Sequence, residues 1–204
     1  GPPDAGPTDA GTDAGSDAGV DAGPPPSILQ HAVGSDHTCV LLDTGVVLCW
    51  GGDYRGQLGD GMTDETFAAD RPDPQPVLGV TNVSAVYAGG GANRALGATG
   101  GAAPRWGLHH PAGFGDVVGG WSAPTPERLF FMGTPAPILE IDHNDSHLCA
   151  RTTMGLHCSG RNSLHQLARE GAQSHLLSRA EGLPAGPTVV SVAVGYSATQ
   201  GFTL

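Results

Sequence analysis

Residues 37–61 read HTCVLLDTGVVLCWGGDYRGQLGDG, and this stretch decides the fold that the whole chain is expected to adopt. Residues 37–42 and 46–51 are short runs rich in valine, leucine and threonine, which is typical of β-strands. The Asp43-Thr44-Gly45 segment between them is a turn signal. Because residues 28–33 also alternate loosely, the stretch predicts neighbouring antiparallel strands.

The pattern recurs along the chain at a spacing typical of repeat proteins. The segment that ends at Gly34 is matched by similar segments that end at Gly89, Asn144 and Gly195, at successive offsets of 55, 55 and 51 residues. Each copy is expected to be one structural unit. The expected repeats are residues 28–79, 83–137, 138–187 and, in part, 188–204.

The copies differ in how much of the first one they retain. The third keeps a pair of cysteines around a turn and a polar loop at residues 162–167. The second has no cysteine, but it keeps Trp106 opposite Trp50 and residues 113–115 opposite residues 57–59.

Three linked motifs in residues 37–61 resemble the repeat of the regulator of chromosome condensation (RCC1) family: His-Thr-Cys, Gly-x-x-x-Cys-Trp-Gly and Gly-Gln-Leu-Gly-Asp-Gly. The resemblance implies a β-propeller in which each repeat supplies one blade of antiparallel strands. The expected fold class is therefore all-β, with RCC1-like propeller blades after a disordered N-terminal tether. The residues expected to hold the blades together are His37, Trp50, Gly56, Gln57, Leu58, Gly59, Trp106 and His147.

Three and a fraction repeats are too few for a complete ring, since propellers close with roughly 4 to 8 blades. The chain is then a fragment of a longer protein, an open array that caps itself, or a protomer that completes its ring with another copy. We favour the fragment. An open end leaves a strand edge and an apolar blade face uncovered, which predicts association through the open propeller edges.

The four cysteines form two pairs that flank turns symmetrically. Cys39 and Cys49 are equally far from Thr44, and Cys149 and Cys158 flank the turn of the third copy in the same way. Directly opposed residues of antiparallel strands have Cβ atoms near the separation that a disulfide requires. We therefore predict two disulfides, which imply an oxidising compartment. Free buried thiols are the alternative.

Composition separates a tether from the repeat domain. Residues 1–26 repeat Asp-Ala-Gly and contain only Val20 as a larger apolar side chain, which predicts a disordered linker before a domain at residues 27–204. Such tracts resemble the spacers of exported bacterial lipoproteins, which implies an upstream lipid anchor and an extracellular or cell-surface location. The net charge of −11, with nine Arg and no Lys, argues against nucleic acid as a partner. No apolar run approaches the roughly 18 residues of a membrane span.

A zinc site is the rival use of His147, Cys149, His157 and Cys158. Because neighbouring residues of a strand point to opposite faces, His157 and Cys158 would not converge on one ion. The chain has no Gly-x-Ser-x-Gly, Walker or dinucleotide motif, and Asp145-Ser146-His147 are neighbours in sequence only. We therefore expect no metal, no cofactor and no catalytic residue.

The leading functional hypothesis is a non-enzymatic recognition or scaffold module at the cell surface that binds a protein or a glycan through its loops. The expected contact surfaces are residues 62–79 and 119–137, which lie outside the repeat pattern. Candidate anchors, chosen because aromatic residues and Arg dominate binding hot spots, are Tyr54, Arg55, Phe67, Arg71, Trp121, Phe130 and Phe131. Ordinary loop packing is the alternative for each of them. The rival functions are a secreted propeller hydrolase or lyase, and nucleotide exchange on a small GTPase.

Overall fold

The computed structural model describes residues 24–63, 70–97, 103–108, 122–129, 137–171, 173–183 and 189–195. The predicted tether up to residue 23, the segment 113–115 and the candidate anchors Phe67, Trp121, Phe130 and Phe131 lie outside these residues. The described part of the chain contains twelve β-strands and no helix, so the expected all-β fold is confirmed. It therefore has no helix of the length and hydropathy needed to cross a membrane.

The strands form three four-stranded antiparallel sheets, each made from consecutive strands. Blade 1 contains β1 (Ile28–Val33), β2 (His37–Leu42), β3 (Val47–Gly51) and β4 (Arg71–Pro76). Blade 2 contains β5 (Val83–Gly89), β6 (Ala92–Gly97), β7 (Ala103–Leu108) and β8 (Ser122–Leu129). Blade 3 contains β9 (Ile138–His143), β10 (His147–Thr152), β11 (Gly155–Arg161) and β12 (Gln173–Arg179).

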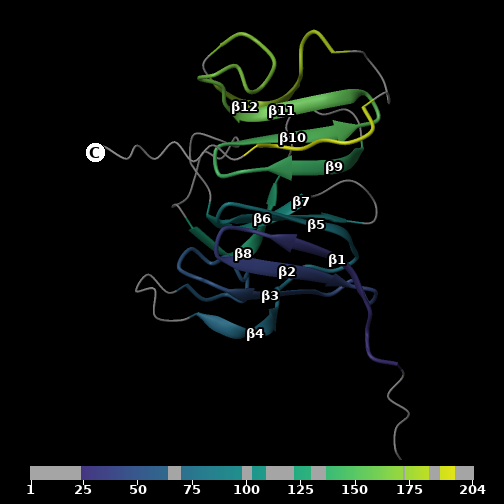
Figure 1. The fold of residues 1–204 in the computed structure, drawn as a ribbon, viewed down its shortest axis with the longest axis vertical. Helices are drawn as coiled ribbons and strands as arrows, with labels where there is room; N and C mark the ends of the chain where they lie inside the picture. The colour runs from purple at the N-terminus through teal and green to yellow at the C-terminus, as the bar shows by residue number, and fades with distance from the viewer. Residues whose placement is uncertain are drawn as a thin grey trace, which may run out of the picture.

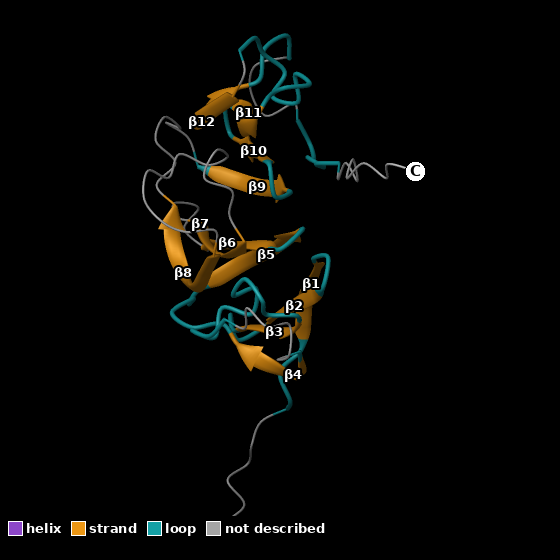
Figure 2. Cartoon of the chain, turned by 90° about the vertical axis from the view of Figure 1, so that its left-hand side faces the viewer, coloured by secondary structure: helices purple, strands orange, loops and turns teal. Residues whose placement is uncertain are grey.

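The first strands of the blades, β1, β5 and β9, lie next to one another, and the blades follow each other along the long axis of the molecule (Figures 1 and 2). Residues 189–195 extend the series beyond blade 3. The backbone N–H of Val194 donates to Asp142 Oδ2 at 2.7 Å, and Asn144 Nδ2 donates to the carbonyl of Gly195 at 2.8 Å. The architecture is thus an open partial array of RCC1-like propeller blades.

The outer strands β4 and β8 lie where the sequence pattern predicted irregular insertions, so this part of the prediction was wrong. Their sequences, Arg71-Pro-Asp-Pro-Gln-Pro76 and Ser122-Ala-Pro-Thr-Pro-Glu-Arg-Leu129, alternate proline with other residues. Proline cannot donate to a neighbouring strand, but an edge strand needs only one of its two sides for pairing. Arg71 therefore lies on an edge strand, and not in an irregular loop.

The hydrophobic core lies between successive blades. One cluster joins Leu41, Val47 and Leu58 of blade 1 to Val86 and Trp106 of blade 2. A second joins blade 2 to blade 3. Because the apolar faces are buried against neighbouring blades, the stability of each sheet depends on the blade beside it.

Both predicted disulfides are present. Cys39 pairs with Cys49 and Cys149 with Cys158, each across directly opposed strand positions with a Cα–Cα distance of 4.1 Å. All four sulfurs are therefore unavailable as metal ligands, which removes the zinc hypothesis for Cys149 and Cys158.

Removing the first disulfide should destabilise the protein measurably. In Cys39→Ala/Cys49→Ala, we expect the free energy of unfolding to fall by about 2–3 kcal/mol, because the bridge restricts the unfolded chain over a short loop. Urea unfolding under non-reducing conditions measures this change. A double variant as stable as the unmodified chain would contradict a structural role for the bridge.

Candidate interaction site

The Gly-Gln-Leu-Gly motif belongs to a loop, residues 53–61, that we call the repeat loop. Asp53 Oδ1 accepts a hydrogen bond from the backbone N–H of Leu58 at 3.0 Å, and Gln57 Oε1 accepts one from the N–H of Arg55 at 2.6 Å. The Gly56 N–H donates to the Asp53 carbonyl at 3.1 Å. The loop is therefore held in shape by bonds within itself.

The repeat loop of blade 1 docks on blade 2. The carbonyl of Gln57 accepts hydrogen bonds from Trp106 Nε1 at 3.0 Å and from Asn93 Nδ2 at 2.8 Å, and all three residues are buried. Ser122 Oγ donates to the carbonyl of Arg55 at 2.8 Å. The sequence motif thus connects neighbouring blades, and we call the surface of blade 2 that receives it the blade 2 socket.

The predicted packing histidines occupy unequal positions. His37 Nε2 lies 2.7 Å from Asn93 Oδ1, so its hydrogen bond joins blade 1 to blade 2. His147, at the same repeat position in blade 3, is only half-buried, and its Nδ1 lies 3.4 Å from Ser146 Oγ. Burial lowers the pKa of both imidazoles.

His143 is a buried histidine that the sequence pattern did not single out as structural. Its side chain is 2% exposed at the end of β9. Burial, and then the positive charge of Arg94, lower its pKa well below the ordinary value of 6.5. The folded protein therefore holds His143 in its neutral form.

Acid should destabilise the protein through these histidines. Since burial lowers the pKa of His37 and His143 in the folded state, the unfolded chain binds more protons below about pH 6.5. We expect the free energy of unfolding to fall as the pH decreases from 7.5 to 5.5. The raised pKa of Asp145 has the opposite effect, because it makes the folded state more stable as the pH falls. Since the ordinary pKa of this carboxyl group is 3.8, the effect occurs mainly at lower pH. Urea unfolding at both pH values tests this, and His143→Gln should show a smaller decrease than the unmodified chain.

A cleft opens on blade 1, on the side of the sheet that faces away from blade 2. It has a volume of about 990 Å³, and we call it the blade 1 cleft. Its lining residues are Asp36, Trp50, Gly51, Gly52, Tyr54, Asp70, Arg71 and Pro72. The aromatic rings and charged groups of this set resemble the composition of protein-binding hot spots.

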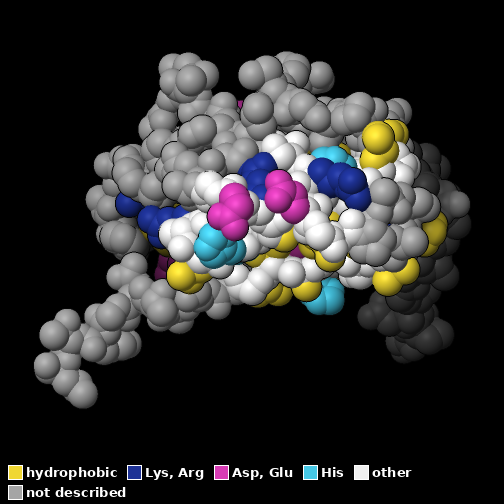
Figure 3. Space-filling view, turned by 90° about the horizontal axis from the view of Figure 1, so that it is seen from above, with side chains coloured by type: hydrophobic (Ala, Val, Ile, Leu, Met, Phe, Trp, Pro, Cys, Tyr) yellow, Lys and Arg dark blue, Asp and Glu magenta, His cyan; other side chains and the backbone are white. Residues whose placement is uncertain are grey.

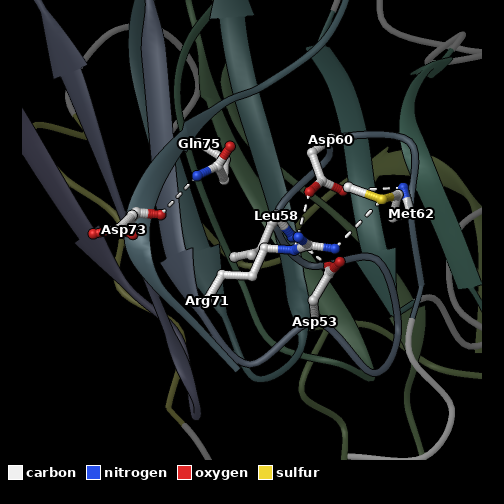
Figure 4. A network of polar contacts seen from close by, with 7 residues as sticks. All are labelled: Asp53, Leu58, Asp60, Met62, Arg71, Asp73 and Gln75. Carbon is white, nitrogen blue, oxygen red and sulfur yellow. Dashed lines mark hydrogen bonds and ion pairs between the residues drawn. The ribbon is translucent and has the colours of Figure 1, made fainter. Parts of the chain in front are cut away.

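Polar contacts fix the side chains of the cleft. The Tyr54 hydroxyl donates to Asp36 Oδ2 at 3.2 Å, and the Arg55 guanidinium lies over the Tyr54 ring at 5.9 Å from its centre. Burial and the nearby charge of Asp36 raise the pKa of Tyr54, so the phenol is neutral at pH 7. Arg71 Nε forms an ion pair with Asp60 Oδ2 at 3.2 Å, which ties β4 to the repeat loop (Figure 4).

The structure thus brings three candidate anchors together at one place. Tyr54 and Arg71 line the cleft, and Arg55 packs on Tyr54. Trp50, which the sequence assigned to packing, is partly exposed and also lines it. Sequence analysis missed Asp36 and Asp70. Asp36 comes just before the motif and Asp70 just before an Arg-Pro strand. Neither position indicated a binding site in the sequence, because only the strand pairing brings the two residues together.

Two other kinds of site, a metal site and a serine nucleophile, concern described residues elsewhere in the chain. No group of three or more His, Cys, Asp or Glu side chains there is placed to hold a metal ion. Ser146 Oγ donates to Asn144 Oδ1 at 3.0 Å and lies 3.4 Å from His147 Nδ1. A smaller cavity of about 280 Å³ lies where β1, β5 and β9 end, lined partly by backbone. On the end of the molecule formed by blade 3, charged side chains of both signs lie close together (Figure 3).

Comparison with known proteins agrees with the fold. Residues 28–57 match the family model of the regulator of chromosome condensation (RCC1) repeat. No curated protein matches the chain in sequence. In fold, the chain is similar to yeast RCC1 (Prp20) bound to Kap60, with a TM-score of 0.65 and 24% identity over 79% of this chain and 39% of that one.

Two further crystal structures are similar. Prp20p from Saccharomyces cerevisiae, described with its binding to Gsp1p and histones, has a TM-score of 0.64 and 24% identity over 86% of this chain and 43% of that one. Human WBSCR16 has a TM-score of 0.63 and 21% identity over 74% of this chain and 37% of that one. The chain thus spans less than half the length of these proteins. It carries an RCC1 repeat and has the fold of RCC1 propeller blades.

Proposed function

We propose that this chain is a non-enzymatic protein-interaction scaffold that binds its partner through the blade 1 cleft. The observation that carries the proposal is the cleft itself, in which Trp50, Tyr54 and Arg71 line one space of about 990 Å³. Tryptophan, tyrosine and arginine are enriched among the few residues that carry most of the binding energy at protein interfaces. Asp36 adds a carboxylate that restricts which charges the partner can present.

The fold supports the same conclusion. Structures of Prp20 include one bound to Kap60 and one described with binding to Gsp1p and histones, so a protein with this fold binds other proteins there. In this chain, disulfides stiffen the central hairpins of blades 1 and 3. A rigid sheet that positions side chains at its edge reduces the entropy lost on binding.

We propose further that the protein acts outside the cytoplasm, at the cell surface or secreted. The two disulfides support this, because they persist in oxidising compartments. Intact mass of the protein isolated from its source without reductant should be lower by four hydrogens than the reduced mass. The reduced mass in that sample would contradict the proposed location.

Site-specific crosslinking tests the binding function. A photoreactive amino acid in place of Tyr54 should capture one protein from an extract of the source cells. The matched control carries the same group in place of Met154, which is 52% exposed at a turn of blade 3.

We expect capture at position 54 but not at 154, and at least a fivefold decrease when Arg71→Ala is added. Equal capture at both positions would contradict the proposal. Loss of capture on addition of free oligosaccharides would instead identify the cleft as a glycan site.

A further inference from the structure

Met62 is an exposed methionine whose sulfur contacts a cation. It directly follows the repeat loop, and its side chain is 50% exposed. The thioether sulfur accepts a hydrogen bond from Arg71 Nη2 at 3.4 Å. A thioether is only a weak acceptor. The sulfur of Met62 is thus accessible to small solutes and makes a contact that a better acceptor would strengthen.

One carboxylate holds both partners of this contact in place. Asp60 Oδ2 forms the ion pair with Arg71 Nε at 3.2 Å, and Asp60 Oδ1 accepts a hydrogen bond from the Met62 backbone N–H at 3.0 Å. Figure 4 shows the Arg71 guanidinium connected both to Asp60 and to the Met62 sulfur. The guanidinium and the Met62 backbone therefore cannot separate without breaking a bond to Asp60.

These contacts join the edge strand β4 to the repeat loop. Arg71 is the first residue of β4, whereas Asp60 belongs to the loop. The Asp60 side chain is 8% exposed and that of Arg71 is 28% exposed, so water and salt screen this ion pair less than a fully exposed pair. A change in the hydrogen bonds of the Arg71 guanidinium therefore changes how firmly β4 is held to the loop.

Oxidation of Met62 would replace the weak acceptor by a strong one. A peroxide transfers one oxygen atom to a lone pair of the sulfur. The S–O bond forms as the O–O bond breaks, the sulfur loses two electrons, and the peroxide is reduced to water or an alcohol. The product, methionine sulfoxide, is a polar group. Its oxygen can accept from Arg71, and a hydrogen bond with an ionised donor is about twice as strong as a neutral one.

Met154 has the same exposure without the cation. Its side chain is 52% exposed, and its backbone N–H donates to Thr152 Oγ1 at 3.1 Å. Within the part of the chain that the structure describes, the Met154 sulfur has no hydrogen bond. A peroxide therefore reaches both sulfurs, but only a sulfoxide at position 62 has a guanidinium beside it. The third methionine, Met132, lies outside the described residues.

We propose that Met62 is an oxidative modification site and that Arg71 responds to its oxidation state. The sulfoxide oxygen accepts the hydrogen bond that Arg71 Nη2 donates to the thioether, and it holds β4 more firmly to the repeat loop. The change is reversible, because methionine sulfoxide reductases restore the thioether. This inference goes beyond the proposed function and does not depend on it, since it concerns only the contacts among Asp60, Met62 and Arg71.

Peroxide treatment of the full chain tests the inference. Peptide mapping by mass spectrometry measures the fraction of sulfoxide at Met62, and NMR measures hydrogen exchange of the Arg71 Nε–H before and after treatment. We expect this proton to exchange at least threefold more slowly once Met62 is oxidised. Treatment with the two methionine sulfoxide reductases, one for each sulfoxide epimer, should restore the initial exchange rate.

Two leucine variants are the matched controls. Met62→Leu cannot form the sulfoxide at this position, so peroxide should leave the exchange of the Arg71 Nε–H unchanged. Met154→Leu removes a methionine of equal exposure that has no contact with Arg71, so it should respond to peroxide as the unmodified chain does. Both side chains are about half exposed, and neither substitution removes a buried group.

Three results would overturn the inference. The first is an unchanged or faster exchange of the Arg71 Nε–H when Met62 is fully oxidised. The second is the same response to peroxide in Met62→Leu as in the unmodified chain, because the effect would then arise from another methionine. The third is the absence of sulfoxide at Met62 under conditions that oxidise Met154, since the sulfur would then not be accessible to peroxide.

Discussion

Trp106→Ala should lower the free energy of unfolding by about 3–5 kcal/mol, the range for removing a large buried aromatic side chain. Trp106 is 1% exposed, packs between blades 1 and 2, and donates to the Gln57 carbonyl. Its removal leaves a cavity and deprives a buried carbonyl of one donor. Urea unfolding monitored by circular dichroism measures the change.

Trp50→Ala is the matched control, since it changes the same residue type at the same repeat position. Because Trp50 is partly exposed and lines the blade 1 cleft, its removal should destabilise the protein by at least about 2 kcal/mol less than Trp106→Ala. Equal losses for the two variants would mean that Trp50 contributes as much packing as Trp106, which would contradict its partial exposure in the blade 1 cleft.

Gly56→Ala should be the most damaging single methyl addition in the repeat loop. The new Cβ atom would meet the backbone of Pro124, which cannot move aside without disturbing the pairing of β8. We expect a loss of about 1–3 kcal/mol from overpacking, added to the strain of an alanine at φ +76°.

Gly79→Ala separates these two effects. Gly79 has φ +67° and nothing within 4 Å of its added Cβ atom, so this variant has backbone strain without collision. The difference in unfolding free energy between the two variants therefore reports how tightly the loop docks on blade 2. A difference near zero between the two unfolding free energies would show that the repeat loop does not pack against the blade 2 socket.

The sequence was informative where the strands contain apolar residues and end at clear turns. Residues 37–42 and 46–51 gave β2 and β3 almost to the residue, and the symmetry of Cys39 and Cys49 gave their bridge. β4 was missed because its alternating prolines read as an irregular segment, although an edge position tolerates them.

The sequence predicted which types of residue form the site, but not where in the structure they come together. Tyr54 and Arg71 were candidates because of their side chains, whereas Asp36 joins them only through the pairing of β2 with β3 and of β3 with β4. The repeat pattern gave Trp50 and Trp106 the same role. The two residues differ because blade 1 covers Trp106, whereas Trp50 stays partly exposed. No local sequence pattern contains that information.

The interface between blades 1 and 2 shows what the repeat loop contacts in the neighbouring blade. The loop contributes backbone carbonyls and two glycines, and the receiving blade contributes an indole N–H and a proline-containing edge strand. Because most of these contacts involve backbone atoms, sequences can diverge widely while the blades continue to pack.

Hydrogen exchange of the two indole N–H groups, followed by NMR and assigned with Trp50→Phe and Trp106→Phe, tests the central claim most directly. We expect the Trp106 proton to exchange slowly, since it is buried and hydrogen-bonded to Gln57, and the Trp50 proton to exchange at least a hundredfold faster. Similar rates for the two protons, or slower exchange at Trp50, would contradict an accessible Trp50 in the blade 1 cleft.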